Sequence, residues 1–118
     1  MLDTANPVRK GEEIDSNAVT EYLMSQGIAL QGQPEVTQFS GGASNWTYRL
    51  KYANRDLILR RPPKGTKAKS AHDMVREYKV QKALQSQYPR VPHMVALCTD
   101  DRVIGCDFYV MDRIEGII

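Results

Sequence analysis

Several features are scarce in this sequence, and each scarcity excludes a class of protein. No apolar run approaches the ~18 residues that a membrane-spanning helix needs, and the amino-terminal segment lacks the apolar core of a secretory signal peptide. Cysteine occurs only at Cys98 and Cys106, without CxxC spacing, so we expect reduced thiols in a cytoplasmic protein and no zinc site. The two histidines, His72 and His93, also lack the spacing of metal ligands. We therefore expect neither membrane association nor a metal site in this chain.

An excess of charge is missing as well. Lys and Arg number 16 and Asp and Glu 14, a net charge of +2, which is too small to make nucleic acid the expected partner. The charge is nevertheless uneven, because residues 60–69 contain five cations. This run fits a solvated basic loop or an anion site, and a nucleic-acid binder is the weakest of the alternatives.

What is present indicates one small globular domain. The 118 residues are 42% hydrophobic and 25% charged, a balance typical of folded soluble chains. Residues 1–14 are polar and aperiodic, so we expect a flexible leader there and a single domain over 15–118.

The hydrophobic periodicity predicts the secondary structure. Apolar residues at helical spacing follow an N-cap at Asp15 or Ser16, and Gly27 ends the run. Beyond residue 34, several short runs alternate between apolar and polar residues, as half-buried strands do. A longer helical run follows Ser70, a good N-cap. The predicted elements are a helix at 16–26, strands at 35–40, 46–52 and 56–61, a helix at 71–87, and strands at 94–98 and 102–111.

A glycine-rich turn separates the first two predicted strands. Residues 40–45 read Ser-Gly-Gly-Ala-Ser-Asn and lie between two strands, so they match neither the Walker A pattern nor the Rossmann fingerprint. Glycine allows such a turn to fold over a ligand and to direct backbone N–H groups at phosphates. The plainer interpretation is an ordinary hairpin, whose tip needs glycine in any case. A polar turn of six residues rather than two favours the covering role.

Two charged residues stand out by their place in the pattern. Alternation puts Arg60 on one face of the third strand with Asp56 and Ile58, where a cation would face the same cavity as the glycine turn. Glu77 falls on the apolar stripe of the second helix, where an unpaired carboxylate is costly. That stripe consists of Met74, Glu77, Tyr78, Gln81 and Leu84. We predict that Arg60 and Glu77 pair; the alternatives are a surface arginine and a Glu77 that pairs with Arg76 or a lysine at the rim.

Four segments, taken in order, resemble a known family. They read FSGGASNWTYRL at 39–50, LILRRPP at 57–63, REYKVQKAL at 76–84 and GCDFYVMDRIEG at 105–116. Their order resembles the small lobe of a kinase. Among kinase-like proteins, the sequence is most similar to the aminoglycoside phosphotransferase superfamily, in the subgroup related to the amino-terminal domain of acyl-CoA dehydrogenase family members 10 and 11. The resemblance implies an α+β fold, a protein-kinase-like N-terminal lobe with an about five-stranded antiparallel sheet, one main packed helix and a short leading helix.

The same resemblance implies an ATP site. The glycine turn would cover the phosphates, Arg60 would stand where most kinases have lysine, and Glu77 would be its partner. Met111 resembles a gatekeeper, and the carbonyl of Asp112 and the N–H of Ile114 would contact adenine. The implied nucleotide-binding residues are Gly41, Gly42, Ala43, Ser44, Asn45, Arg60, Glu77, Met111, Asp112 and Ile114. The implied cofactors are ATP and Mg²⁺, with the metal ligands in a large lobe.

The family's catalytic machinery lies beyond the resembling segments. A His-Gly-Asp loop, a later metal-binding aspartate and the acceptor site belong to that large lobe, which this sequence does not contain. We therefore expect the ATP-binding small lobe of a small-molecule phosphotransferase, which transfers the γ-phosphoryl group of ATP to a substrate hydroxyl. We expect no catalytic residue in this chain and no activity from it alone. The acceptor is either an aminoglycoside or another hydroxylated metabolite, such as an acyl thioester.

The alternative function is a non-catalytic one. A kinase-lobe remnant would act as an interaction or self-association module and would form homo-oligomers through an exposed lobe face. We expect Val110, Met111 and Ile114 to be solvent-exposed on that face.

Overall fold

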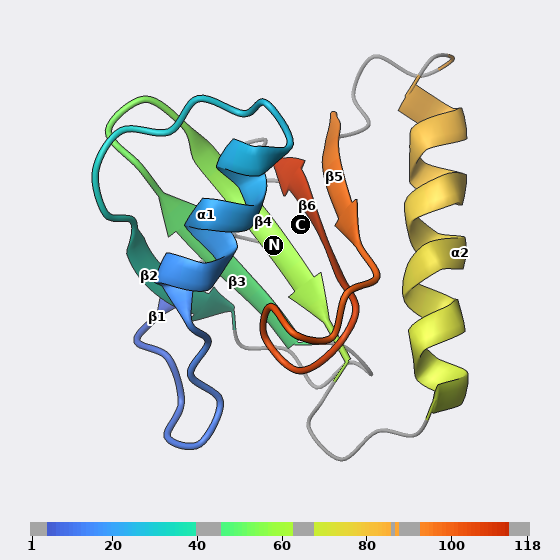
Figure 1. Ribbon diagram of the computed structural model, residues 1–118, viewed down its shortest axis with the longest axis horizontal. Coiled ribbons are helices and arrows are strands. Elements are labelled where there is room, and N and C mark those ends of the chain that lie inside the picture. Colours follow the sequence, from blue (N-terminus) through green and yellow to red (C-terminus); the bar gives the residue numbers. More distant parts are fainter. Residues whose placement is uncertain (1–4, 40–45, 63–67, 86, 88–92, 114–118) are drawn as a thin grey trace.

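A computed structural model describes residues 5–39, 46–62, 68–85, 87 and 93–113, apart from the side chains of residues 5, 6 and 68–73. Its centre is a six-stranded antiparallel sheet in the order β1-β2-β3-β4-β6-β5 (Figure 1). The elements along the chain are β1 (Ala5–Asn6), α1 (Ser16–Ser25), β2 (Glu35–Phe39), β3 (Trp46–Lys51), β4 (Asp56–Arg61), α2 (Ala68–Gln85), β5 (Met94–Cys98) and β6 (Phe108–Asp112).

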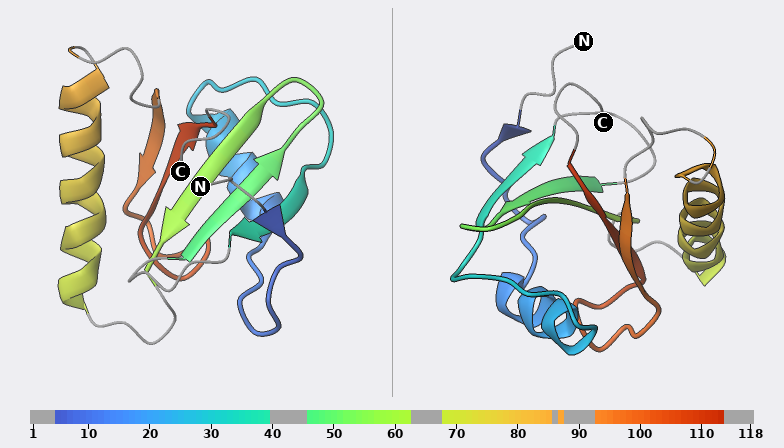
Figure 2. Two further views of the ribbon diagram at one scale, coloured as in Figure 1. Left: turned by 180° about the vertical axis from the view of Figure 1, so that it is seen from behind. Right: turned by 90° about the horizontal axis from the view of Figure 1, so that it is seen from above.

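The sheet lies between the two helices (Figure 2). α1 crosses one face over β3 and β4, whereas α2 runs beside β5 and β6 on the other side. We call the face toward α1 the outer face; it carries Tyr48 and Leu59. We call the opposite face the inner face; it carries Ile58 and Tyr109. None of the described helices is long and apolar enough to cross a membrane.

Alternation along β3 and β4 builds the outer core. Tyr48 and Leu50 of β3 are opposite Leu59 and Leu57 of β4, and all four side chains are fully buried. α1 closes this layer with Val19 and Leu23, which are four residues apart and therefore on the same side of the helix. The buried residues of the outer core are Val19, Leu23, Leu30, Tyr48, Leu50, Tyr52, Leu57, Leu59, Ala96, Cys98, Phe108 and Val110.

The inner core is smaller and lies mainly under α2. Met74 of α2 is buried against Ile58 of β4 and against Tyr109 and Met111 of β6. Because β6 alternates between the two cores, its residues 108–111 are all buried, and the strand reads as a continuous apolar run. β6 therefore joins the two cores, as does β4, which contributes Leu57 and Leu59 to the outer core and Ile58 to the inner core.

The two ends of α1 follow the sequence signals. The Asp15 carboxylate accepts a hydrogen bond from the Ala18 N–H at 3.1 Å, as an N-cap does. At the other end, Gly27 has a φ of +89°. The N–H of Gly27 donates to the carbonyl of Met24 at 3.0 Å, and that of Ile28 to the carbonyl of Leu23 at 3.1 Å. These two bonds form a Schellman motif, which is why glycine suits this position.

The predicted elements are confirmed, with corrections at their bounds. The α2 helix begins at Ala68, so Ser70 lies inside the helix and the prediction of an N-cap there is wrong. The last strand begins at Phe108 rather than at residue 102, because residues 101–106 form turns. A hydrogen bond from the Arg102 N–H to the Asp100 carboxylate stabilises that turn.

One short strand was absent from the prediction. β1 lies within the segment expected to be a flexible leader and pairs with β2, with Ala5 opposite Phe39. Farther along, the Glu12 carbonyl accepts a hydrogen bond from the Tyr48 hydroxyl at 2.5 Å. A two-residue strand has no periodicity to detect, which explains the omission. The flexibility of residues 1–14 stays a prediction.

Candidate functional site

The inner face carries the predicted cation. Arg60 follows Ile58 by two residues on β4 and is opposite Tyr109 of β6. Its side chain is only 20% exposed. The Nε atom is buried and has no hydrogen-bond partner among the described residues. Arg60 is therefore not an ordinary surface arginine, because a buried N–H donor of a guanidinium needs an acceptor.

The predicted pairing of Arg60 with Glu77 is present in the structure. Nη1 of Arg60 and Oε1 of Glu77 are 3.9 Å apart. Glu77 lies on α2 beside the fully buried Met74, but its side chain remains 34% exposed, so it sits at the rim of the inner core. Leu84, on the same predicted apolar stripe, is 36% exposed. The stripe therefore faces the sheet at its amino-terminal part and is more exposed toward its end.

Tyr109 joins this pair, and sequence reasoning missed it. Its hydroxyl accepts a hydrogen bond from Nη1 of Arg60 at 3.3 Å and donates one to Oε1 of Glu77 at 3.2 Å. Burial raises the pKa of the Tyr109 hydroxyl, so it stays protonated at neutral pH. The alternation of β6 could have placed Tyr109 on the face of Arg60, but the strand register that sets them opposite each other is a tertiary feature.

The predicted gatekeeper and hinge residues continue β6. Met111 is 3% exposed and lies opposite Ile58 in the inner core. The Asp112 N–H donates to the carbonyl of His93 at 2.9 Å, and the Asp112 carboxylate accepts from Arg55 at 2.9 Å. Val110 is fully buried as well, so the expectation that Val110 and Met111 are solvent-exposed is wrong. The sheet already buries them, one on each face.

Other predicted site residues lie outside the described residues. These are the glycine turn, Gly41 to Asn45, and the hinge residue Ile114. Of the predicted nucleotide-binding residues, the structure thus describes Arg60, Glu77, Met111 and Asp112.

A charged cluster on the sheet was also not predicted. Nε and Nη2 of Arg49 on β3 donate to the two carboxylate oxygens of Asp56 on β4 at 2.9 and 2.7 Å. Nη1 of Arg113 lies 3.7 Å from the same carboxylate. The backbone N–H of Arg113 donates to the backbone carbonyl of Asp56 at 3.0 Å. Asp56 thus ties the end of β6 to β4. The signal was the pair of opposite charges on the two strands of one predicted hairpin, close to its turn.

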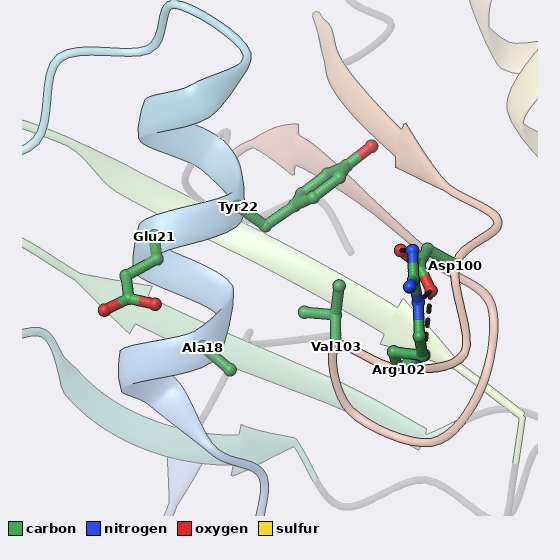
Figure 3. Close-up of a pocket in the computed structure, with 6 residues that line it drawn as sticks. All are labelled: Ala18, Glu21, Tyr22, Asp100, Arg102 and Val103. Atoms are coloured by element: carbon green, nitrogen blue, oxygen red, sulfur yellow. Dashed lines mark hydrogen bonds and ion pairs between the residues drawn. The ribbon is translucent and has the colours of Figure 1, made fainter.

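The structure also contains a cavity on the opposite side of the sheet. It has a volume of about 480 Å³ and lies between α1 and the turn that joins β5 to β6 (Figure 3). Tyr22 extends from α1 toward β5, where its hydroxyl donates to the Leu97 carbonyl at 2.8 Å. Asp100 and Arg102 at the rim pair with each other at 3.0 Å. This cavity is separate from the Arg60 site; Asp100 and Arg102 neutralise each other, and Glu21 of α1 adds a further negative charge to the lining.

Comparison with known proteins decides the family. Residues 35–118 match the phosphotransferase enzyme family. The chain belongs to this family. It is 42% identical to acyl-CoA dehydrogenase family member 10 of Mus musculus over 118 residues, which is 99% of this chain and 11% of that protein. It is 36% identical to family member 11 of Homo sapiens over 110 residues, which is 90% of this chain and 14% of that protein.

A solved phosphotransferase-family structure supports the fold. A crystal structure from Ralstonia eutropha, assigned as an aminoglycoside phosphotransferase, superposes with a TM-score of 0.68 and 32% sequence identity, over 89% of this chain and 29% of that one. The predicted fold, a kinase-like N-terminal lobe with an antiparallel sheet and two helices, is therefore confirmed, as is the resemblance to acyl-CoA dehydrogenase family members 10 and 11. The phosphotransferase chain described here spans less than a third of each of these relatives.

Proposed function

We propose that this chain is the ATP-binding small lobe of a phosphotransferase that transfers the γ-phosphoryl group of ATP to a hydroxyl of a small molecule. The observation that carries the proposal is the position of Arg60, on the inner face of the sheet and within 3.9 Å of the Glu77 carboxylate of α2. A guanidinium stays charged at all physiological pH values and binds two phosphate oxygens at once. Family membership supplies the reaction class.

The described residues fit a polyphosphate. Arg60 keeps a buried Nε–H without an acceptor among them, and its charge is only partly offset by a Glu77 side chain at the rim. Bound ATP would supply the phosphoryl group, and Arg60 would bind and orient its phosphates. The glycine turn, Gly41 to Asn45, is expected to cover the phosphates, and Met111, Asp112 and Ile114 are expected to border the adenine.

No metal ligand is assigned within the described part of the chain. The described residues bring together no group of three or more His, Cys, Asp and Glu side chains that could hold a metal ion. We therefore assign no Mg²⁺ ligand to them and expect those ligands, with the catalytic base and the acceptor site, in a separate large lobe. We expect this chain alone to bind ATP without transferring its phosphate.

The test is a comparison of Arg60→Ala with Arg102→Ala. Both variants remove one positive charge, but Arg102 is 86% exposed and pairs with Asp100 on the outer side. ATP in excess should raise the melting temperature of the wild-type chain, since a ligand that binds only the folded state stabilises it by ~2.7 kcal/mol at a hundredfold excess over Kd. Arg60→Ala should weaken ATP binding at least about tenfold, because a charge-assisted hydrogen bond contributes ~1.5–3 kcal/mol. Arg102→Ala should bind as the wild type does.

The outcomes separate the two functions considered above. A wild-type chain that is folded but gives no saturable response to ATP, with or without Mg²⁺, contradicts the nucleotide proposal and favours a non-catalytic interaction module. Equal loss in the two arginine variants would mean that the effect is one of net charge and not of the Arg60 site.

A further inference from the structure

A tyrosine hydroxyl stands between the cation and the acid of the candidate site. The direct distance from Nη1 of Arg60 to Oε1 of Glu77, 3.9 Å, is within the range of an ion pair but longer than a hydrogen bond. Each of these two atoms is instead within hydrogen-bond distance of the Tyr109 hydroxyl, at 3.3 and 3.2 Å. The cation and the acid are therefore hydrogen-bonded through the hydroxyl, in a chain of three groups.

The three hydrogen-bonded side chains differ in how deeply they are buried. Tyr109 is fully buried, whereas the side chains of Arg60 and Glu77 are 20% and 34% exposed. The Tyr109 ring packs edge-on against Tyr78 of α2, with the centroids 6.3 Å apart and the planes at 62°. A tyrosine has two side-chain torsions, fewer than arginine or glutamate, so a packed ring fixes its oxygen well. The buried, ring-packed member thus lies between two longer and more exposed side chains.

The protonation of the hydroxyl suits a central place. A protonated phenol can donate one hydrogen bond and accept another, whereas a phenolate can only accept. Burial is the largest cause that raises the pKa of Tyr109, and the Glu77 charge adds to it, while Arg60 acts in the opposite direction. At neutral pH the hydroxyl can therefore accept from Arg60 and donate to Glu77 simultaneously.

We infer that Tyr109 is a positioning residue for Arg60. Its hydroxyl holds Nη1 of the guanidinium and leaves the Nε–H, which has no acceptor among the described residues, to an anionic ligand. Because the guanidinium is planar and rigid, fixing one Nη restricts the directions of all its N–H groups. The ligand is the polyphosphate of the proposed function, on which this inference rests.

The decisive variant is Tyr109→Phe, which removes the oxygen and keeps the buried ring. The control is Tyr22→Phe, which also removes one hydroxyl donor, here half-buried on the outer side and bonded to the Leu97 carbonyl. In the ¹⁵N-labelled chain, the Nε–Hε signal of Arg60, assigned by its loss in Arg60→Lys, should shift and exchange faster with water in Tyr109→Phe. It should stay unchanged in Tyr22→Phe. Glu77→Gln removes the negative charge on the other side of the Tyr109 hydroxyl, so it should also move this signal.

ATP titration gives the second measurement. We expect Tyr109→Phe to bind ATP about three- to tenfold more weakly, since it loses one hydrogen bond to a charged group. In the Arg60→Ala background the same change should cause no further loss, because a positioning residue acts only through the group that it positions. A purely structural tyrosine would instead lower affinity by the same factor in both backgrounds.

The outcomes keep the two proposals apart. An unchanged Arg60 signal in a folded Tyr109→Phe chain overturns the positioning role, whatever the affinity of the wild type. Equal losses of affinity in the two backgrounds overturn it as well. Absence of ATP binding by the wild-type chain overturns the proposed function, and with it the assignment of a polyphosphate as the ligand that Tyr109 prepares Arg60 to bind.

Discussion

Arg60 and Arg61 are neighbours in the sequence and lie on opposite faces of the sheet. Arg60 reaches the acid of α2 on the inner face. Arg61 is 4% exposed on the outer side, where its guanidinium stacks 5.2 Å from the centroid of the Trp46 ring and its Nε donates to the Pro62 carbonyl at 3.0 Å. The period of two in a strand produces this difference, so two identical side chains have different chemistry. Of these two neighbours, Arg60 is the one on the inner face, where the proposed ligand would bind.

Among the described residues, Tyr48 should contribute most to the loss of folding stability at alkaline pH. Its burial raises the pKa to about 12, and its hydroxyl donates to the Glu12 carbonyl, a bond that the phenolate cannot make. The unfolded chain loses this proton near pH 10, before the folded chain does. The stabilising effect is therefore complete below about pH 10 and is lost as the pH rises toward 12. We expect Tyr48 alone to account for about 2 kcal/mol of that loss.

The measurement is urea unfolding of wild type and Tyr48→Phe at pH 8, 10 and 11. Tyr48→Phe should be less stable at pH 8 by about 1 kcal/mol, because it lacks one hydrogen bond. Its stability should then fall less steeply with pH, so the two curves converge. Curves that stay parallel up to pH 11 would show that Tyr48 does not titrate as its environment requires. Tyr22, Tyr52 and Tyr109 also have raised pKa values, so the variant keeps part of the slope.

At the scale of elements, the carboxyl-terminal end of α1 shows how one glycine determines where a helix ends. Gly27 has a φ of +89°, and a Cβ added there would meet nothing within 4 Å. Gly27→Ala should therefore destabilise the chain only through its backbone, by ~1–2 kcal/mol, because L-residues disfavour the left-handed region. Gly27→Asn should cost less, since asparagine enters that region more easily. Chemical denaturation measures both, and an alanine variant as stable as the wild type would contradict the Schellman assignment.

The elements also show what the sequence can and cannot predict. Periodicity located β4 and β5 to the residue and both helices to within a few residues, because each buries at least one apolar stripe. It failed before Phe108, where Val103 and Ile104 continue the apolar pattern although residues 101–106 form turns. A half-buried turn and a strand leave the same pattern in the sequence.

The candidate site was predictable for a different reason. Arg60 and Glu77 stand out because a charge in an apolar pattern is costly unless it is paired, and that rule needs no coordinates. Tyr109 did not stand out, since a tyrosine in a buried strand needs no special explanation. Its role depends on the antiparallel register of β4 and β6, which brings it opposite Arg60. Local patterns identify charged partners, whereas pairing between distant strands determines what lies between them.

For the whole molecule, the main question is whether the two cores form one folding unit. They are separated by the sheet but share β6, which contributes Phe108 and Val110 to the outer core and Tyr109 and Met111 to the inner core. A strand buried on both faces cannot leave one core without exposing the other. We therefore expect the 118-residue chain to unfold in a single transition.

Leu23→Ala and Met74→Ala test this unity from opposite sides. Both side chains are buried, Leu23 in the outer core and Met74 in the inner one, so each variant should lose ~2–5 kcal/mol. Their controls lie on the same helices: Met24→Ala and Val80→Ala remove side chains that are 52% exposed and should cost far less.

Trp46 makes the result decisive. It is the only tryptophan of the chain and packs against the outer core, so its fluorescence reports on that side alone, whereas far-UV circular dichroism reports on the whole chain. With one folding unit, Met74→Ala lowers the midpoint of the fluorescence transition as much as that of the dichroism transition, although Met74 and Trp46 lie on different sides of the sheet. If Met74→Ala instead leaves the Trp46 transition in place and adds an earlier step in the dichroism, the inner core melts by itself, and Arg60, Tyr109 and Glu77 would separate before the rest of the lobe unfolds.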